Sequence, residues 1–358
     1  MKKALLISAL TLGLACPGFA QQTKILTADK GNDYGLVYSL PDTGLLITVT
    51  AKRTVYLAGP YAKYAKKYLA TDKVISEGYE EWTITDVTVD RYGAVNPESQ
   101  YIMTVKPGSQ TFIAVNQDGM IQTINRKPAE NIGEPLYRPA EQTPAEAIPT
   151  GKEYLQFVDE DFIASQSSAK QAEMLAANIM EVRDARLSLT RGTADTMPTD
   201  GRQLELMLNS LNKQEHDMTA AFTGNSYSET VTRTFTFVPE DDTTMTLFRF
   251  SDFKGFCSAN DYAGSPFTVR VNVTARGSLP VDANGKEKEI PKDGVRYTIP
   301  GSAQITLTHD NNTYYNRELE FGQMGIVFGL NPNLFTDKKN PSYAIFNPIT
   351  GGLLELGN

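Results

Sequence analysis

The chain has 358 residues, with 34 lysines and arginines against 42 aspartates and glutamates, and its formal net charge is −8. Because nucleic acids are polyanions, this acidic balance argues against a nucleic-acid partner. The two cysteines and two histidines leave few residues for a disulfide framework or for imidazole-based catalysis. The length is sufficient to bury large cores and suggests two or three domains.

Residues 1–20 have the parts of a secretory signal peptide: a lysine pair, an apolar run over residues 4–15, and a small residue at Ala20. They predict cleavage before Gln21 and export to the periplasm or the outer membrane. Lipid attachment at Cys16 is the alternative, because the residues before it partly resemble a lipoprotein box. No later stretch has the roughly 20 apolar residues of a membrane-spanning helix, so any membrane association is expected to be peripheral.

Residues 21–125 are predicted to form an N-terminal antiparallel β module. The stretches GLVYSL and LLITVTA flank residues 41–44, which have the composition of a turn, and EWTITDVTVDRY alternates in part between apolar and polar residues. The stretch TFIAVNQDGMIQTI, residues 111–124, indicates a hairpin in which Gly119 supplies the positive φ of the turn.

A short helix is predicted within this module at GPYAKYAKKYLA, residues 59–70. Helical spacing puts its tyrosines on one face and most of its lysines on the other. The pattern has two interpretations: an aromatic platform with a basic rim for sugar rings or anionic glycans, or ordinary packing of an amphipathic helix, which such a stripe favours. The candidate partner-binding residues here are Tyr61, Tyr64, Tyr68, Lys63 and Lys67.

Residues 126–152 contain five prolines and few large apolar side chains. Proline fixes φ and removes a backbone donor, so this stretch is predicted to be an extended, proline-rich linker between domains.

Residues 153–224 have the clearest helical signals. A capping box at Ser168 and a stop at Gly192 delimit a first helix, and a second begins at Asp200 and ends at Gly224. With apolar stripes along both, the pair is predicted to form an antiparallel helical hairpin.

Arg183 and Arg186 lie near the apolar stripe of the first helix, and Glu205 and Glu215 on the second helix could meet them across the hairpin. One interpretation is an ion-pair lock between the helices, and the other is a charged grip on a partner. Both arginines are therefore candidate partner-binding residues, with the lock favoured.

Residues 225–358 are predicted to form a C-terminal β module. Along residues 267–274 the odd-numbered residues are apolar and the even-numbered ones polar, which places Arg270 on a solvated sheet face, as in a sandwich. The predicted fold class is thus mainly β with an α-helical hairpin: two antiparallel β-sandwich-like modules separated by a proline-rich linker and two helices.

The two β modules resemble each other weakly. YSLPDTGLLITVT from Tyr38 resembles YTIPGSAQITLT from Tyr297, and TFIAVNQDGMIQTI from Thr111 resembles SYAIFNPITGGLLEL from Ser342, in the same order. Duplication would explain both pairs, but strands joined by turns also resemble one another by chance.

Sequence motifs for catalysis are missing. There is no His-Glu-x-x-His, no Gly-x-Ser-x-Gly and no glycine-rich phosphate loop, and His216, His309 and Cys257 stand apart from one another in sequence. No catalytic, cofactor-binding or metal-binding residue is therefore assigned, and no cofactor is expected. A glycan hydrolase with paired carboxylates on a β scaffold is the alternative, because such a pair leaves no sequence signature.

Several phrases together, VYSLPDTGLLITVT, GPYAKYAKKYLA, RDARLSLTRGTADTMPTDGRQLELMLNSLNKQE, FTG and YTIPGSAQITLT, resemble an uncharacterised family of secreted Bacteroidota envelope proteins, a domain of unknown function. The resemblance implies secretion and the same domain plan, and it brings no activity or catalytic residue. The resulting hypothesis is a non-enzymatic binding or assembly module of the cell envelope, with an envelope protein or a glycan as partner. A purely structural, oligomeric subunit is a further alternative.

Overall fold

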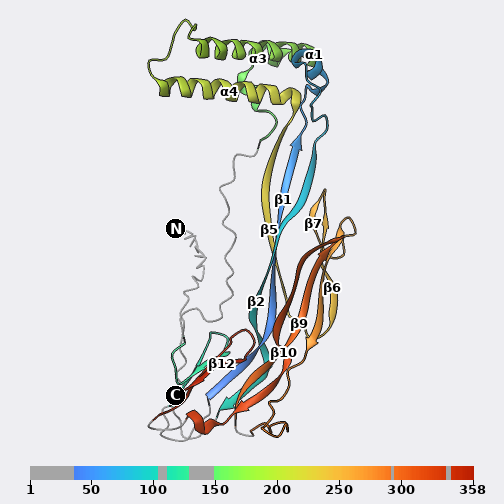
Figure 1. Cartoon of the computed structure of the whole chain (residues 1–358). Helices are drawn as coiled ribbons and strands as arrows, with labels where there is room; N and C mark the ends of the chain where they lie inside the picture. The colour runs from blue at the N-terminus through green and yellow to red at the C-terminus, as the bar shows by residue number, and fades with distance from the viewer. Residues whose placement is uncertain (1–35, 104–110, 129–148, 292–293, 336–339) are drawn as a thin grey trace, which may run out of the picture.

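A computed structural model describes residues 36–103, 111–128, 149–291, 294–335 and 340–358. The predicted signal peptide with Cys16, and most of the predicted linker, lie outside the described residues. The described chain forms an elongated molecule, with a helical hairpin across one end of a long sheet, a sandwich in the middle and a small sheet at the other end (Figure 1).

Three antiparallel sheets make up the β structure. The first has the order β2 (Tyr79–Met103), β1 (Leu36–Leu57), β5 (Asn225–Phe237). The second has the order β10 (Asn312–Leu330), β9 (Val295–His309), β8 (Ser265–Ala275), β6 (Thr243–Ser251), β7 (Gly255–Cys257). The third has the order β12 (Leu353–Gly357), β11 (Tyr343–Phe346), β4 (Ile121–Ile124), β3 (Ile113–Val115).

The helices gather mainly at one end of the molecule, here called the head (Figure 1). They are η1 (Ala62–Tyr64), α1 (Ala65–Leu69), η2 (Glu153–Phe157), α2 (Glu160–Ala164), α3 (Ser168–Arg191) and α4 (Gly201–Thr223), while η3 (Pro332–Phe335) lies at the opposite end. The mainly β fold class and the packed helical pair predicted from the sequence are confirmed.

The two ranges predicted as β modules contribute to the same sheets. β1, from the N-terminal range, pairs from Leu45 to Leu57 with β5 from the C-terminal range. In the small sheet β4 pairs with β11. β1 and β4 each already pair with a neighbouring strand on one edge. The pairings with β5 and β11 give hydrogen-bond partners to backbone N–H and C=O groups on the other edge, which a local hairpin would leave unpaired.

The predicted turn at residues 41–44 is wrong, because β1 runs straight through it. Its register with β2 shifts between Ser39 and Pro41, a bulge that accommodates a residue without an N–H. Thr43 is then held by the opposite sheet, since its N–H donates to Gln323 Oε1 at 2.7 Å and its hydroxyl donates to the carbonyl of Ile349 at 2.9 Å. Tertiary hydrogen bonds therefore override the turn-like composition.

The sandwich core lies between the first and second sheets. Phe248 of β6 stacks between Phe235 of β5 and Phe267 of β8, with ring centroids 4.6 Å apart in both pairs. The predicted alternation in β8 is confirmed, since Phe267, Val269 and Val271 are buried and the residues between them face solvent. Because alternate residues of a strand point to opposite faces, burial of the apolar residues in this core directs the polar residues of the second sheet to its outer face.

The internal resemblance seen in the sequence is present in the backbone. Ser39 of β1 forms a parallel bridge to Met120, and Thr298 of β9 forms the equivalent parallel bridge to Gly352. The β3–β4 and β11–β12 hairpins carry their register shifts just before Val115 and Phe346, respectively. Four strands and two bridges therefore repeat with the same pairings in two halves of the β structure, here called the two copies, which is the arrangement that duplication would produce.

The head has no counterpart in the second copy. β9 and β10 are joined by a tight turn in which Asp310 has a φ of 49°, whereas the connection from β1 to β2 contains η1 and α1. The remaining helices of the head come from the segment between the copies. The head is therefore the part of the described structure that the repeat does not account for.

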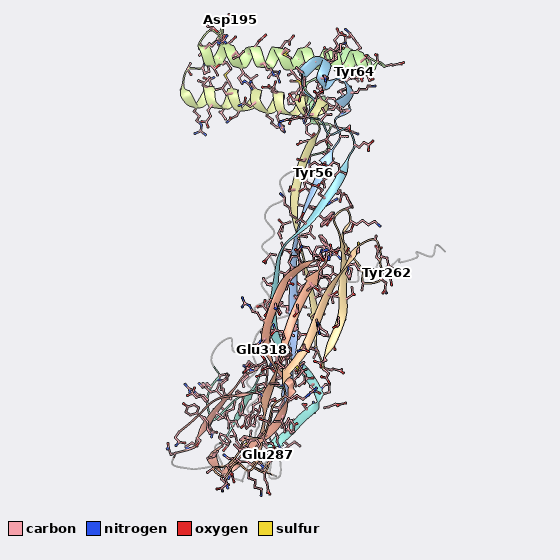
Figure 2. The ribbon with its side chains drawn as sticks, turned by 45° about the vertical axis from the view of Figure 1, so that its right-hand side comes forward. Tyr56, Tyr64, Asp195, Tyr262, Glu287 and Glu318 are labelled. Atoms are coloured by element: carbon pink, nitrogen blue, oxygen red, sulfur yellow. The ribbon has the colours of Figure 1, made fainter. Side chains whose placement is uncertain are left out.

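A single layer of sheet, here called the neck, joins the head to the sandwich (Figure 2). It consists of residues 52–57, 79–81 and 225–230 of β1, β2 and β5. Tyr56 of β1 lies opposite Tyr79 of β2, and their rings stack with centroids 4.3 Å apart. With no second sheet against it, the neck depends on cross-strand side-chain pairs.

Arg53 connects all three strands of the neck. Its Nη2 lies 2.6 Å from Glu80 on β2, and its Nη1 lies 2.6 Å from Glu229 on β5. The guanidinium also lies over the Trp82 ring, 5.6 Å from the centroid. One central arginine thus holds both outer strands through charge-assisted hydrogen bonds.

The neck is expected to weaken in acid. The Arg53 guanidinium lowers the pKa of the Glu80 carboxyl, so the stabilisation is present above the unfolded pKa of about 4.3 and is lost as pH falls through the lower folded value. Thermal unfolding from pH 7 to pH 2 should therefore show Glu80→Gln less stable than the parent at neutral pH, with the gap closing in acid. Glu98→Gln, at an exposed site, is the control; a gap for Glu80→Gln that is constant with pH would contradict the assignment.

Candidate functional site

The head has its own apolar core, made by α3 and α4 together with the residues that lead into and out of the neck. Asp200 accepts the N–H of Gln203 at 2.7 Å, as predicted for the start of α4. The N-cap of α3 is Ser167 rather than the predicted Ser168, and Gly192 ends the helix with a φ of 71°. The local signals in the sequence therefore locate both helices to within a residue.

Tyr61 belongs to this core. It is buried against the rings of Tyr154, Phe162 and Phe222, and its hydroxyl donates to Gln171 Oε1 at 3.2 Å. Burial raises the pKa of Tyr61. The buried position of Tyr61 is the one expected if the tyrosine stripe of residues 59–70 serves packing.

Tyr64 and Tyr68 are half-buried and pack against the head core. Tyr64 lies at the end of the head that joins the neck (Figure 2). Lys63 lies over the Tyr64 ring at 4.9 Å, and Lys67 over the Tyr68 ring at 4.6 Å. The Tyr64 hydroxyl is 3.3 Å from that of Ser168. Both rings thus have lysines of this chain over them, and partner binding by these four residues stays a prediction.

Arg183 and Arg186 meet on one carboxylate. Arg183 Nε donates to Glu215 Oε1 at 2.6 Å, and Arg186 donates to Glu215 Oε2 and, at 3.1 Å, to Asn212 Oδ1. Glu215 is only 15% exposed, whereas Glu205 points to solvent on the same helix. The geometry is that of an inter-helix lock centred on Glu215.

Within the described residues, the hairpin on the far side of this lock consists of two helices and the loop between them. Its outer half, residues 180–211, projects sideways from the neck and ends at the loop around Asp195 (Figure 2). A hollow of about 560 Å³, here called the tip hollow, opens between the helices and this loop. Its walls include Ala185, Leu189, Thr196, Met207, Ser210 and Leu211.

Large apolar side chains are exposed along this outer half, and one of them, Met207, lines the tip hollow; the exposed set is Met180, Leu187, Met197, Leu206 and Met207. Closer to the neck, Leu175 and Ile179 of α3 are fully buried, because residues from α2, η2 and the connection after β1 cover them. Two helices cannot enclose a core without a further layer. The outer half of the hairpin is therefore an incomplete helical bundle.

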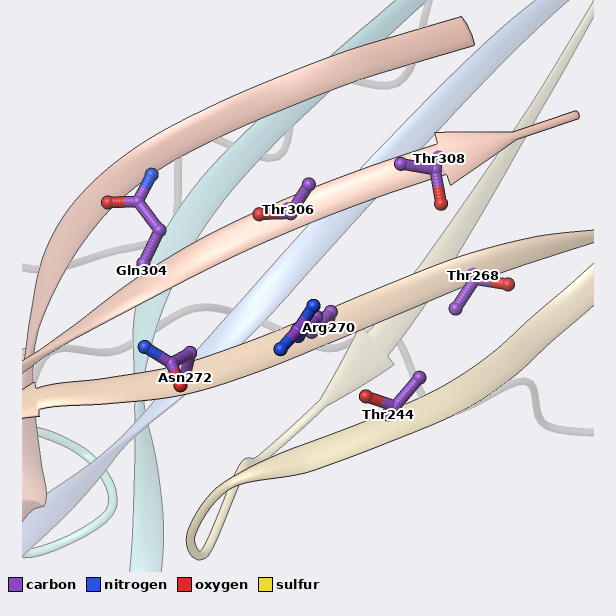
Figure 3. Close-up of a pocket in the computed structure, with 7 residues that line it drawn as sticks. All are labelled: Thr244, Thr268, Arg270, Asn272, Gln304, Thr306 and Thr308. Carbon is purple, nitrogen blue, oxygen red and sulfur yellow. The ribbon is translucent and has the colours of Figure 1, made fainter. Parts of the chain in front are cut away.

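A second hollow, of about 470 Å³, lies on the outer face of the second sheet and is here called the polar hollow (Figure 3). Its lining comes from β6, β8 and β9 and consists of Thr244, Thr268, Arg270, Asn272, Gln304, Thr306 and Thr308. The sequence pattern placed Arg270 outward but gave no sign of the hollow, because the outward residues of the neighbouring strands come together only through strand pairing.

Neither hollow brings two carboxylates together among the described residues. The polar hollow has no carboxylate among its lining residues, and the tip hollow has Asp195. The Arg53 guanidinium lowers the pKa of Glu80, and the backbone N–H of Asp242 lowers that of Asp241. A glycosidase acid needs a raised pKa and a second carboxylate nearby.

The remaining nucleophile and base candidates do not form a site. Burial raises the pKa of the Cys257 thiol, which disfavours the reactive thiolate. His309 is buried with Nδ1 3.3 Å from the carbonyl of Pro266, and His216 is exposed on α4. Within the described ranges, no cluster of three or more His, Cys, Asp or Glu side chains suits a metal ion.

Comparison with known proteins gives a family of unknown function. No curated protein and no solved structure matches the chain. In the part of the chain that the structure describes, none of the helices combines the length and apolar character needed to span a membrane. A family model matches residues 34–354, and the chain therefore belongs to the family described as Domain of unknown function (DUF4831).

Proposed function

We propose that this protein is an exported, non-enzymatic binding module of the cell envelope, and that the outer half of its helical hairpin docks an amphipathic helix of an envelope protein. The observation that carries the proposal is the incomplete bundle: apolar side chains are exposed along the outer half of the hairpin, and Leu189, Met207 and Leu211 line the tip hollow.

The chemistry of the tip hollow fits a helical partner. Small residues such as Ala185 and Ser210 line the groove and allow close approach, while Met207 and Leu211 offer adaptable apolar contact. A third helix laid along the groove would cover these side chains and complete the layer that α3 and α4 lack. The neck supports this arrangement, since it holds the hairpin away from the sandwich (Figure 1).

Export is part of the proposal. The lysine pair and apolar run of residues 1–20 support it, and peripheral association with the outer membrane follows if Cys16 carries a lipid. The resemblance to secreted Bacteroidota envelope proteins points the same way.

Crosslinking in intact cells, followed by mass spectrometry, tests the docking surface. Leu206 on the hairpin is 62% exposed, and Leu354 at the other end of the molecule is 60% exposed, so Leu206→Lys and Leu354→Lys are a matched pair. We expect Leu206→Lys to reduce recovery of one envelope protein about tenfold or more, and Leu354→Lys to leave it unchanged.

Two results would overturn the proposal: equal recovery with both variants, or no envelope protein crosslinked to residues 180–211. Recovery of only a second copy of the chain would replace it with the structural-subunit alternative, which light scattering of the purified protein would then show as a stable oligomer.

A further inference from the structure

The polar hollow is centred on one cation. In the register of the second sheet, Arg270 of β8 lies opposite Thr244 of β6 and opposite Thr306 of β9. Figure 3 shows its guanidinium among the hydroxyl and amide side chains of the three strands. The positive charge therefore lies in the middle of the hollow rather than on its rim.

This arginine has no ion-pair partner among the described residues, whereas two nearby arginines are held by groups of the chain. Arg249 donates to the carbonyls of Ala259 and Gly264, at 3.0 and 3.1 Å. Arg276 pairs with Asp241 at 2.6 Å. Since an exposed arginine within reach of a carboxylate normally pairs with it, the guanidinium of Arg270 is available for an anion from outside the chain.

The nearest strand that carries acidic residues on this face is β10, with Glu318 and Glu320, of which Glu318 lies nearer to Arg270 in the register. Glu318 lies opposite Gln304 on β9 and accepts the hydroxyl of Thr274. Gln304 in turn donates to Asn316 Oδ1 at 2.6 Å. The amides and hydroxyls are thus oriented by one another, while the cation is left without a counter-charge.

Threonines alone would not mark a site, because a solvated sheet face is rich in threonine for conformational reasons. The outer face of the first sheet has its own threonine pairs, with the hydroxyls of Thr50 and Thr232 3.2 Å apart. There, however, Asp86 of β2 lies opposite Thr50. The first face therefore has both an acidic residue, Asp86, and a basic one, Lys52, whereas the lining of the polar hollow has Arg270 and no carboxylate.

We propose that the polar hollow binds a carboxylated polysaccharide, a polyuronate, with Arg270 holding one sugar carboxylate through paired N–H donors. Threonine, asparagine and glutamine side chains recur about 4.8 Å apart between strands and about 7 Å apart along them, a spacing over which they can bond hydroxyls of successive sugars. The lining residues include no aromatic ring, so the site lacks the stacking surface used for neutral sugars. Its volume of about 470 Å³ is within the range of about 300–1,000 Å³ of small-molecule sites.

Calorimetric titration of the purified protein with oligogalacturonate tests this site. The fully methyl-esterified oligomer is the matched ligand, because it keeps the sugar chain and removes the charge. We expect binding of the acid form that weakens with added salt, at least about tenfold weaker binding of the ester, and a similar loss in Arg270→Gln. Arg270→Lys should retain part of the affinity, since it keeps the charge without the planar fork.

Arg202→Gln is the control variant, because Arg202 is exposed in the first turn of α4 and far from the sheet. It should bind like the parent, and so should Leu206→Lys, which separates this site from the proposed protein-docking surface. Equal affinity for the acid and the ester, an unchanged affinity in Arg270→Gln, or no binding of the acid oligomer would each overturn the proposal.

Discussion

Phe222→Ala is expected to destabilise the head by about 3–5 kcal/mol, the usual cost of truncating a buried phenylalanine. Phe222 is fully buried at the end of α4, and its ring centroid lies 5.8 Å from that of Tyr61. The side chain therefore packs α4 against the segment that follows β1 in the chain. Its loss would leave a cavity at the junction of the head and the neck.

Thermal unfolding followed by circular dichroism at a helix wavelength and by calorimetry would measure the effect. The head core and the sandwich core share no buried residue, so helix signal should be lost in the variant well below the temperature at which the sheets unfold. Phe253→Ala is the control, because Phe253 is 72% exposed and should change stability by less than about 0.5 kcal/mol. An unchanged helix transition in Phe222→Ala would contradict this division into two cores.

Features set by neighbouring residues could be predicted from the sequence. Asp200 caps α4 and Gly192 ends α3 because capping and positive φ are decided within one turn of helix. The hairpin at residues 111–124 was predictable for the same reason, with Gly119 at a φ of 80°.

Features set by distant residues could not be predicted. The path of β1 through Pro41 depends on Gln323 and Ile349, which contact Thr43 from the other end of the chain. The pairing of β1 with β5, across the whole helical hairpin, has no local signature either. Any alternating strand of suitable length could have served as that partner.

The candidate sites also combine features set by neighbouring residues with features set by distant ones. Helix phase was enough to bring Arg183 and Arg186 toward α4, but it left two acidic partners open, and the structure selects Glu215. For Arg270, alternation along β8 predicted the outward direction, whereas its position among polar side chains of β6 and β9 required the register of three strands.

Glu215→Ala is expected to lower the stability of the hairpin by about 2 kcal/mol. The carboxylate accepts from both arginines across the helix interface, and its removal leaves two like charges side by side at a partly buried position. Breaking a buried pair from one side costs about 3–5 kcal/mol, and the partial exposure of Arg183 and Arg186 reduces that figure. Glu205→Ala, at an exposed site on the same helix, should be nearly neutral.

This substitution also separates the two interpretations of the arginines. If they lock the hairpin, Glu215→Ala and Arg183→Ala both lower the helix transition in thermal unfolding, and crosslinking to a partner falls only as the hairpin loosens. If they grip a partner, Glu215→Ala frees both guanidinium groups and raises the crosslinking yield, while Arg183→Ala lowers it with little change in stability. The bonds to Glu215 favour the first outcome, because a guanidinium already donating to an internal carboxylate has to break those bonds before it can bind another.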